Sequence, residues 1–225
     1  MVALIEALRL RLPGYEMHLH GPPPVPCALL DPATLRDVQG NIGHSLPPLL
    51  IEVWCRIGNG GFGPGYGLLG VGPGGFTDDM GRTADEVYVA FRTRSKNPPL
   101  FRWPDGIFPI CHFGCAIYHC VDLATEEMVI WEPNAWDGRH DPVTALFPAG
   151  RSLAEWFETW AKGETPSKWL ADDPATGISL LAPMRPAVSA SRPRTRRTED
   201  DQPDLFAPLR EPPSNATDAR PKKQS

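Results

Sequence analysis

Apolar and polar residues along the N-terminal quarter of the chain alternate with the period of an α-helix. The apolar residues that share one face are Leu4, Ile5, Leu8 and Leu12 in residues 2–12, Leu35, Val38 and Ile42 after Asp31-Pro32, and Leu50, Val53, Trp54 and Ile57 after Ser45-Leu-Pro-Pro48. The pattern therefore predicts three helices. Asp31 is a preferred N-cap and Pro32 fits the first helical position, while Gly58-Asn-Gly-Gly61 is typical of a helix end.

The pattern changes after residue 61. A glycine-rich strand region is expected over residues 62–71, followed by a loop through Gly81. Two further helices are expected to begin at capping boxes, Thr83-Ala-Asp-Glu86 and Ser152-Leu-Ala-Glu155. Three strands are predicted between them: Ile107–His112, Ala116–Leu123 and Met128–Glu132. Helices at both ends of an antiparallel β-meander predict an α+β fold.

Composition divides the chain into unequal parts. Residues 186–225 combine seven prolines with runs of charge, and they hold too few apolar residues to form a core, so they are expected to be a disordered tail. The expected organisation is an N-terminal helix and proline-rich connector (1–30), an α+β domain (31–171), a short extension (172–185) and the tail. This arrangement predicts a single folded domain.

Charge and cysteine usage limit the classes of function. The tail has eight basic and six acidic residues, so residues 1–185 keep 14 of the 22 basic and 21 of the 27 acidic residues, a formal net charge of −7. An acidic body disfavours specific nucleic-acid binding and suits a basic protein partner, although solubility alone also explains it. No apolar run is long enough for a membrane span, and the N-terminus lacks a signal-peptide pattern. Five cysteines are too few for a secreted disulfide scaffold, so a cytoplasmic protein is expected.

Six sequence features follow one another in an order that resembles a known superfamily. They are Leu46-Pro-Pro-Leu-Leu50, Asn59-Gly-Gly61, Gly63-Pro-Gly-Tyr-Gly-Leu-Leu69, Trp103-Pro-Asp-Gly-Ile-Phe-Pro-Ile110, Gly114-Cys-Ala-Ile-Tyr118 with Val121-Asp-Leu123, and Glu155-Trp-Phe-Glu-Thr-Trp160 with Gly163. Over residues 31–171 the chain resembles the SUKH superfamily, which includes fungal cell-wall-synthesis regulators and many bacterial toxin-immunity proteins. The resemblance implies a non-enzymatic domain that binds another protein, most directly an immunity protein that neutralises a cognate bacterial toxin.

Two other functions stay open at this stage. A regulatory or scaffold protein could bind partners through its domain or its tail, where Gln202-Pro-Asp-Leu-Phe206 resembles the peptide with which bacterial proteins dock on the DNA sliding clamp. A metal- or cysteine-dependent hydrolase is the third, because one segment concentrates zinc-ligand residue types: Cys111, His112, Cys115, His119 and Cys120. Adjacent strand residues point to opposite faces, so these side chains are not expected to hold a metal.

No catalytic, cofactor-binding or metal-binding residue is therefore predicted. The glycine-rich segment matches the spacing of a dinucleotide-binding loop several times, but a dinucleotide site needs that loop between a strand and a helix. Ten glycines in eighteen residues produce such matches by chance. We expect no cofactor.

The candidate binding residues are carboxylates. Four of them lie in the long, irregular segment 72–86, which should be exposed: Asp78, Asp79, Asp85 and Glu86. Asp105 is a second choice, because an Asp-Gly turn explains it equally well. These residues could meet a basic toxin domain, since charge complementarity speeds association. The alternative is an ordinary solvated surface, and the sequence specifies neither the partner nor the oligomeric state.

Overall fold

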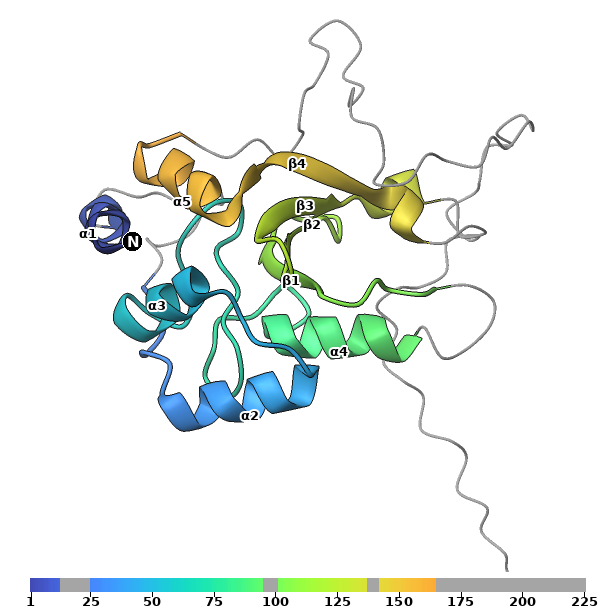
Figure 1. Ribbon diagram of the computed structural model, residues 1–225, viewed down its shortest axis with the longest axis horizontal. Coiled ribbons are helices and arrows are strands. Elements are labelled where there is room, and N and C mark those ends of the chain that lie inside the picture. The colour runs from blue at the N-terminus through green and yellow to red at the C-terminus, as the bar shows by residue number, and fades with distance from the viewer. Residues whose placement is uncertain (13–24, 95–100, 137–141, 165–225) are drawn as a thin grey trace, which may run out of the picture. The chain divides into compact units, whose positions relative to one another are not determined.

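Figure 1 shows the computed structural model of the chain, which describes residues 1–12, 25–94, 101–136 and 142–164. The described residues all belong to one compact unit, Met1–Pro193. The expected extension, the expected tail and its sliding-clamp-like motif lie outside the described residues.

The described residues form an α+β fold, as the sequence predicts. The helices are α1 (Val2–Arg11), α2 (Pro32–Ile42), α3 (Pro48–Arg56), α4 (Ala84–Arg94) and α5 (Leu153–Ala161). The strands are β1 (Ile107–His112), β2 (Tyr118–Asp122), β3 (Glu127–Trp131) and β4 (Leu146–Ser152), with short 3-10 helices η2 (Pro133–Ala135) and η3 (Pro142–Ala145) before β4. The strands pair in the order β1-β2-β3-β4, each antiparallel to its neighbour, which makes the predicted meander.

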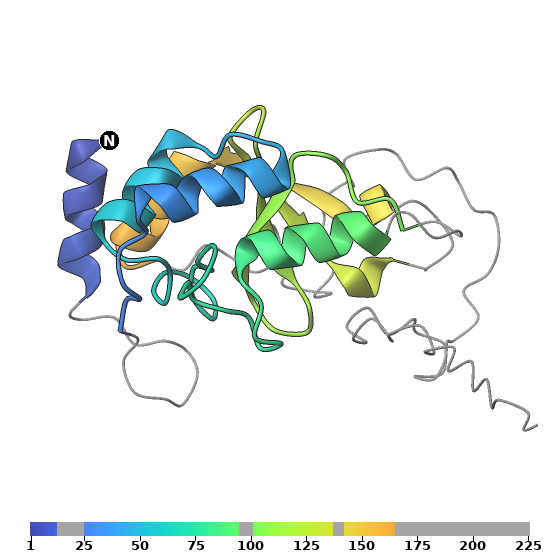
Figure 2. The ribbon, with the colours of Figure 1, turned by 90° about the horizontal axis from the view of Figure 1, so that it is seen from below.

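The two faces of the sheet pack against different helices. Tyr118 of β2 points toward α4, where its ring lies edge-on to Phe91 at a centroid distance of 5.8 Å. The next residue, His119, points to the opposite face and accepts a hydrogen bond from Trp156 of α5. Helix α1 contacts α5 and α3, and Figure 2 shows α2 and α4 lying next to each other along one side of the unit.

The helix starts follow the sequence signals. The Asp31 carboxylate accepts hydrogen bonds from the backbone N–H groups of Ala33 and Thr34 at the start of α2. Ser152 and Glu155 form both halves of the capping box that begins α5. Trp54 and Trp156 are fully buried, as expected for residues in an apolar helical stripe.

The glycine-rich segment differs from the prediction, because it folds into turns with one isolated bridge, between Leu68 and Cys111. The buried Asn59 side chain takes the place of a strand partner, since its amide bonds both the N–H and the C=O of Val71. Gly70 packs so closely that a Cβ atom there would overlap the Asn59 carbonyl oxygen. These glycines therefore serve close backbone packing.

Strand β4 was not predicted, because Pro148 and Gly150 argue against a strand in sequence. The structure accommodates Pro148 because β4 is the outer strand of the described sheet. Pro148 lies opposite Val129, and the hydrogen bond from Glu132 N to Ala145 O sets the alternation so that the N–H missing at residue 148 would point away from β3. Among the described residues, no helix has the length and apolar character needed to cross a bilayer.

Candidate partner-binding site

The four carboxylates of segment 72–86 have different environments. The Asp78 side chain has no exposed surface, so the expectation that it lies open to a partner is wrong. Asp85 is half-buried, whereas Asp79 and Glu86 are exposed. The four residues therefore do not form a uniform acidic patch.

The buried Asp78 carboxylate accepts hydrogen bonds from five donors. Its Oδ2 atom accepts hydrogen bonds from Arg82 Nε (3.1 Å), Arg82 Nη2 (2.8 Å) and the Tyr118 hydroxyl (2.8 Å). Its Oδ1 atom accepts from the backbone N–H groups of Met80 and Arg82, both at 2.9 Å. The Gly81 N–H bonds the Asp78 carbonyl, which closes the turn between them. A local turn thus brings Arg82 back onto Asp78.

This network fixes the charges at the site. Burial alone would raise the pKa of Asp78, but the hydrogen bonds from Arg82 and Tyr118 outweigh it and lower the pKa. Burial, and then the nearby Asp78 charge, raise the pKa of Tyr118 well above that of a free phenol. Asp78 is therefore ionised and Tyr118 neutral at physiological pH. Their bond fastens the loop before α4 to strand β2.

Asp85 and Glu86 form the start of α4. Asp85 Oδ1 accepts hydrogen bonds from Gly72 N (2.9 Å) and the Thr83 hydroxyl (2.7 Å), and Glu86 Oε2 accepts from Thr83 N (2.9 Å). The bond from Thr83 N to Glu86 is one half of the predicted capping box, while the Thr83 hydroxyl donates to Asp85. Both carboxylates accept hydrogen bonds at the start of the helix, and Asp85 also bonds the preceding loop through Gly72.

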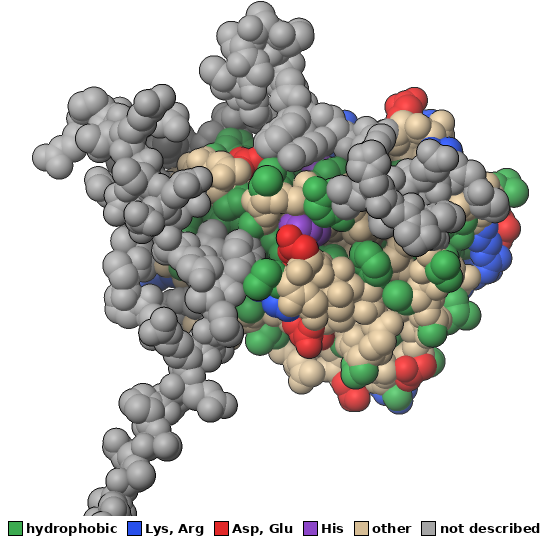
Figure 3. Space-filling view, turned by 180° about the vertical axis from the view of Figure 1, so that it is seen from behind, with side chains coloured by type: hydrophobic (Ala, Val, Ile, Leu, Met, Phe, Trp, Pro, Cys, Tyr) green, Lys and Arg blue, Asp and Glu red, His purple; other side chains and the backbone are tan. Residues whose placement is uncertain are grey.

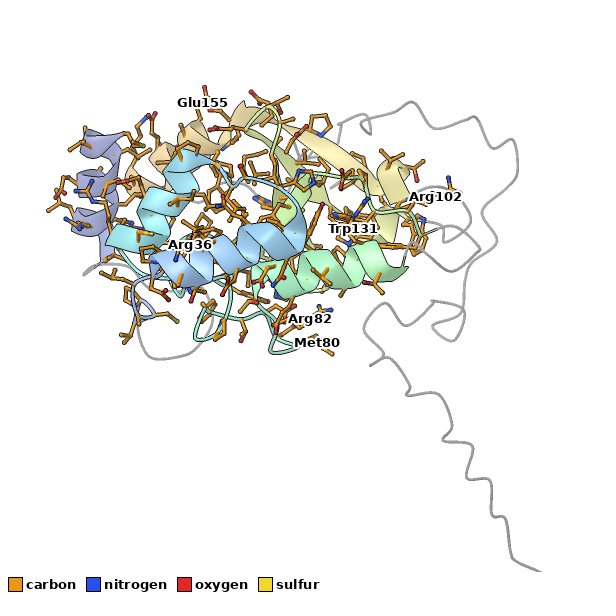
Figure 4. All side chains as sticks on the ribbon, turned by 60° about the horizontal axis from the view of Figure 1, so that its bottom comes forward. Arg36, Met80, Arg82, Arg102, Trp131 and Glu155 are labelled. Atoms are coloured by element: carbon orange, nitrogen blue, oxygen red, sulfur yellow. The ribbon has the colours of Figure 1, made fainter. Side chains whose placement is uncertain are left out.

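Asp79 differs from its neighbours, because 60% of its side chain is exposed. Its Oδ1 atom lies 3.9 Å from Nε2 of the buried His112 at the end of β1. Met80, next along the chain, is 50% exposed, and Figure 4 shows it at the outer end of the loop, pointing away from the ribbon. Figure 3 shows acidic side chains scattered among apolar and basic ones over one face of the described residues. Asp79 and Met80 give this loop an outward acidic and apolar surface.

Asp105 is exposed but already engaged. Its side chain is 64% exposed, yet its Oδ1 atom accepts hydrogen bonds from His44 Nε2 and the Tyr88 hydroxyl and forms an ion pair with Arg92 Nη2, each at 3.1 Å. The hydrogen bond from His44, together with those groups, lowers the pKa of Asp105. Because these three partners come from α4 and from the segment after α2, Asp105 joins these elements to the chain before β1.

The cysteines and histidines lie as the strand geometry predicts. Cys111 and Cys120 are buried, and burial raises the pKa of both thiols. His119 accepts from the Trp156 indole at 2.9 Å through Nδ1, so a neutral imidazole carries its proton on Nε2. Cys115 is exposed at the β1–β2 turn. In the part of the chain that the structure describes, no three His, Cys, Asp or Glu side chains gather as a metal site would require.

Three residues of this region were not singled out from the sequence: Tyr66, Met80 and Arg82. The turn signal for Arg82 was present, since Asp at the first and Gly at the fourth position favour a type I turn. No local sequence pattern indicates that Tyr118 is the second partner of Asp78, because 40 residues separate them. Comparison with family models, with curated proteins and with solved structures finds no match for this chain.

Proposed function

We propose that this chain is a cytoplasmic, non-enzymatic protein-binding domain that acts as an immunity protein and neutralises a basic toxin domain. One observation carries the proposal. The loop before α4 is fastened to the sheet by the buried Asp78–Arg82–Tyr118 network, and it holds Asp79 and Met80 outward. A loop that is ordered before binding loses less conformational entropy in the complex, and more of the contact energy remains as affinity.

The charge of the chain supports the same partner class. Residues 1–185 carry a formal net charge of −7, which attracts a cationic partner and raises its association rate at low salt. An exposed methionine beside a carboxylate also suits a binding surface, because the unbranched thioether adapts to different apolar contacts. The resemblance to immunity proteins of the SUKH superfamily points to a toxin as that partner.

Coexpression in bacteria tests the proposal. The full chain is produced together with each toxin-domain gene found beside its own gene, and cell survival is scored. We expect rescue by the unchanged chain and loss of rescue by a double variant, Asp79→Ser with Met80→Ser. Glu158→Gln on α5 is the matched control, because it removes an exposed carboxylate from another element.

The two failures have different meanings. Full rescue by the double variant would place the interface elsewhere on the domain. Failure of the unchanged chain to rescue cells from any adjacent toxin would refute the immunity function.

A further inference from the structure

Three segments that are distant in sequence meet beside Asp79. The ring of Tyr66, in the glycine-rich segment, lies edge-on to His112 with centroids 5.4 Å apart, and His112 Nε2 lies 3.9 Å from Asp79 Oδ1. Gly114 of the β1–β2 turn packs against the hydroxyl end of Tyr66, since a Cβ atom there would lie 2.6 Å from the tyrosine hydroxyl. Figure 2 shows these three segments along the same edge of the unit. We call Tyr66, Asp79, Met80 and Cys115 the loop face.

The β1–β2 turn has an unfavourable backbone for its sequence. Ile117 N donates to Gly114 O, and the two central residues, Cys115 and Ala116, have φ values of 51° and 57°. Two consecutive positive φ angles are typical of a type I′ turn, in which Asn-Gly is preferred because side chains crowd the backbone there. Such strain concentrates at functional positions. The exposed tip of the loop face therefore keeps side chains where glycine would relieve strain.

The side chains of the loop face match one kind of group. Asp79 offers a largely exposed carboxylate, and the half-buried Tyr66 offers an aromatic ring, both in contact with His112. A planar guanidinium satisfies both, because it stacks on an aromatic ring and pairs with a carboxylate through two parallel N–H groups. The nearby Arg82 is committed to Asp78 and to the Tyr118 hydroxyl.

We propose that the loop face binds an arginine side chain of the partner protein, with the guanidinium over Tyr66 and against Asp79. This inference rests on the proposed protein-binding function and names the anchor that the partner supplies. Met80 then contacts the apolar stem of that arginine or the residues beside it. Arginine is frequent among the side chains that dominate binding energy at interfaces.

A titration of the full chain with a small guanidinium compound tests this site directly. The probe is arginine amide, and its binding is followed by amide chemical shifts in a ¹⁵N spectrum. The matched probe is citrulline amide, which keeps the shape of arginine amide but lacks the guanidinium charge. We expect saturable shifts at Tyr66, Asp79 and Gly114 with arginine amide only. Asp79→Asn and Tyr66→Leu should each weaken this binding by about two- to fivefold, the factor expected for one exposed ion pair or one cation–π contact.

Two variants separate the chemistry of the ring from its packing. Tyr66→Phe keeps the aromatic face and should bind arginine amide as tightly as the unchanged chain, whereas Tyr66→Leu should show the weakening of about two- to fivefold. Glu158→Gln removes a carboxylate from α5 and should change nothing. Shifts spread evenly over the surface, or equal binding by Tyr66→Leu and Tyr66→Phe, would overturn the arginine site.

The outcome is separable from the test of the immunity function. Toxin rescue without localised shifts from arginine amide refutes the anchor and leaves the proposed function intact. Localised shifts that depend on Asp79 and Tyr66 support the anchor even where no toxin is neutralised.

Discussion

The loop before α4 and the turn before β1 differ in how far the fold already bonds their carboxylates. In the loop before α4, Asp78 is buried and surrounded by donors, while the adjacent Asp79 is mostly exposed and lies 3.9 Å from His112 Nε2. In the turn before β1, Asp105 is as exposed as Asp79, yet two hydrogen bonds and one ion pair from other elements meet at one of its oxygens. The comparison shows that exposure does not measure availability. A carboxylate is open to a partner only when its own fold has not already satisfied it.

The largest expected effect is the loss of the buried carboxylate. Asp78→Asn removes the charge that Arg82 and Tyr118 bond, and we expect it to lower the free energy of unfolding by about 3 kcal/mol, as for a broken buried ion pair. The value should lie at the low end of the usual range, because 20% of the Arg82 side chain remains exposed. Urea unfolding measures the change. Asp37→Asn, at an exposed position of α2, is the control, and equal midpoints for the two variants would contradict the proposed role of Asp78.

The second prediction concerns pH. Because the pKa of Asp78 is lowered in the folded state, the unfolded state takes up the proton first as pH falls. The stabilisation by Asp78 is therefore complete above the ordinary aspartate pKa of about 3.9 and is lost as pH falls below it toward the folded-state pKa. The difference in unfolding free energy between wild type and Asp78→Asn should thus narrow on acidification. A difference that stays constant between neutral and strongly acidic pH would show that the charge of Asp78 does not matter.

A smaller effect on stability is expected at the exposed Asp105. Asp105→Asn removes one charge from a solvent-screened cluster, so it should cost less than about 1 kcal/mol, and the cost should shrink at high salt. Urea unfolding at low and high ionic strength tests this. A loss as large as that of Asp78→Asn would erase the distinction between the two regions.

The smallest effect on stability belongs to Asp79. Asp79→Asn should change the free energy of unfolding by less than about 0.5 kcal/mol, because no described donor bonds its carboxylate as closely as those around Asp78. The same variant should weaken the binding of arginine amide by about two- to fivefold. Thermal unfolding and arginine amide titration on one sample measure both. A marked loss of stability would make Asp79 a structural residue and remove it from the loop face.

Much of the fold was predictable because its signals are local. The Asp31 cap and the Ser152–Glu155 capping box each act within one helical turn, and both are present as predicted. Strand β4 was missed because Pro148 and Gly150 disfavour strands, and only its position at the edge of the sheet makes them tolerable. The turns of residues 62–71 were missed because the partner of Val71 is a side chain, Asn59.

The candidate site was predictable only in part. Charge and spacing pointed to segment 72–86, and the expected exposure of Asp79 is confirmed. The burial of Asp78 depends on Tyr118, which reaches it from a strand 40 residues away. The engagement of Asp105 depends likewise on His44 and Arg92, which come from other elements. Such long-range contacts are set by the packed structure and leave no local pattern.

Pro148 has a consequence for how copies of the chain meet one another. An outer strand presents unpaired N–H and C=O groups to which a strand of another molecule can add. At Pro148 that outward row lacks a donor, so a strand approaching β4 from another copy would leave one of its carbonyl groups without a bond. Pro148 is thus the residue that argues against a strand in the sequence, and in the structure it disfavours the addition of further strands to β4 and so the growth of the sheet into an aggregate.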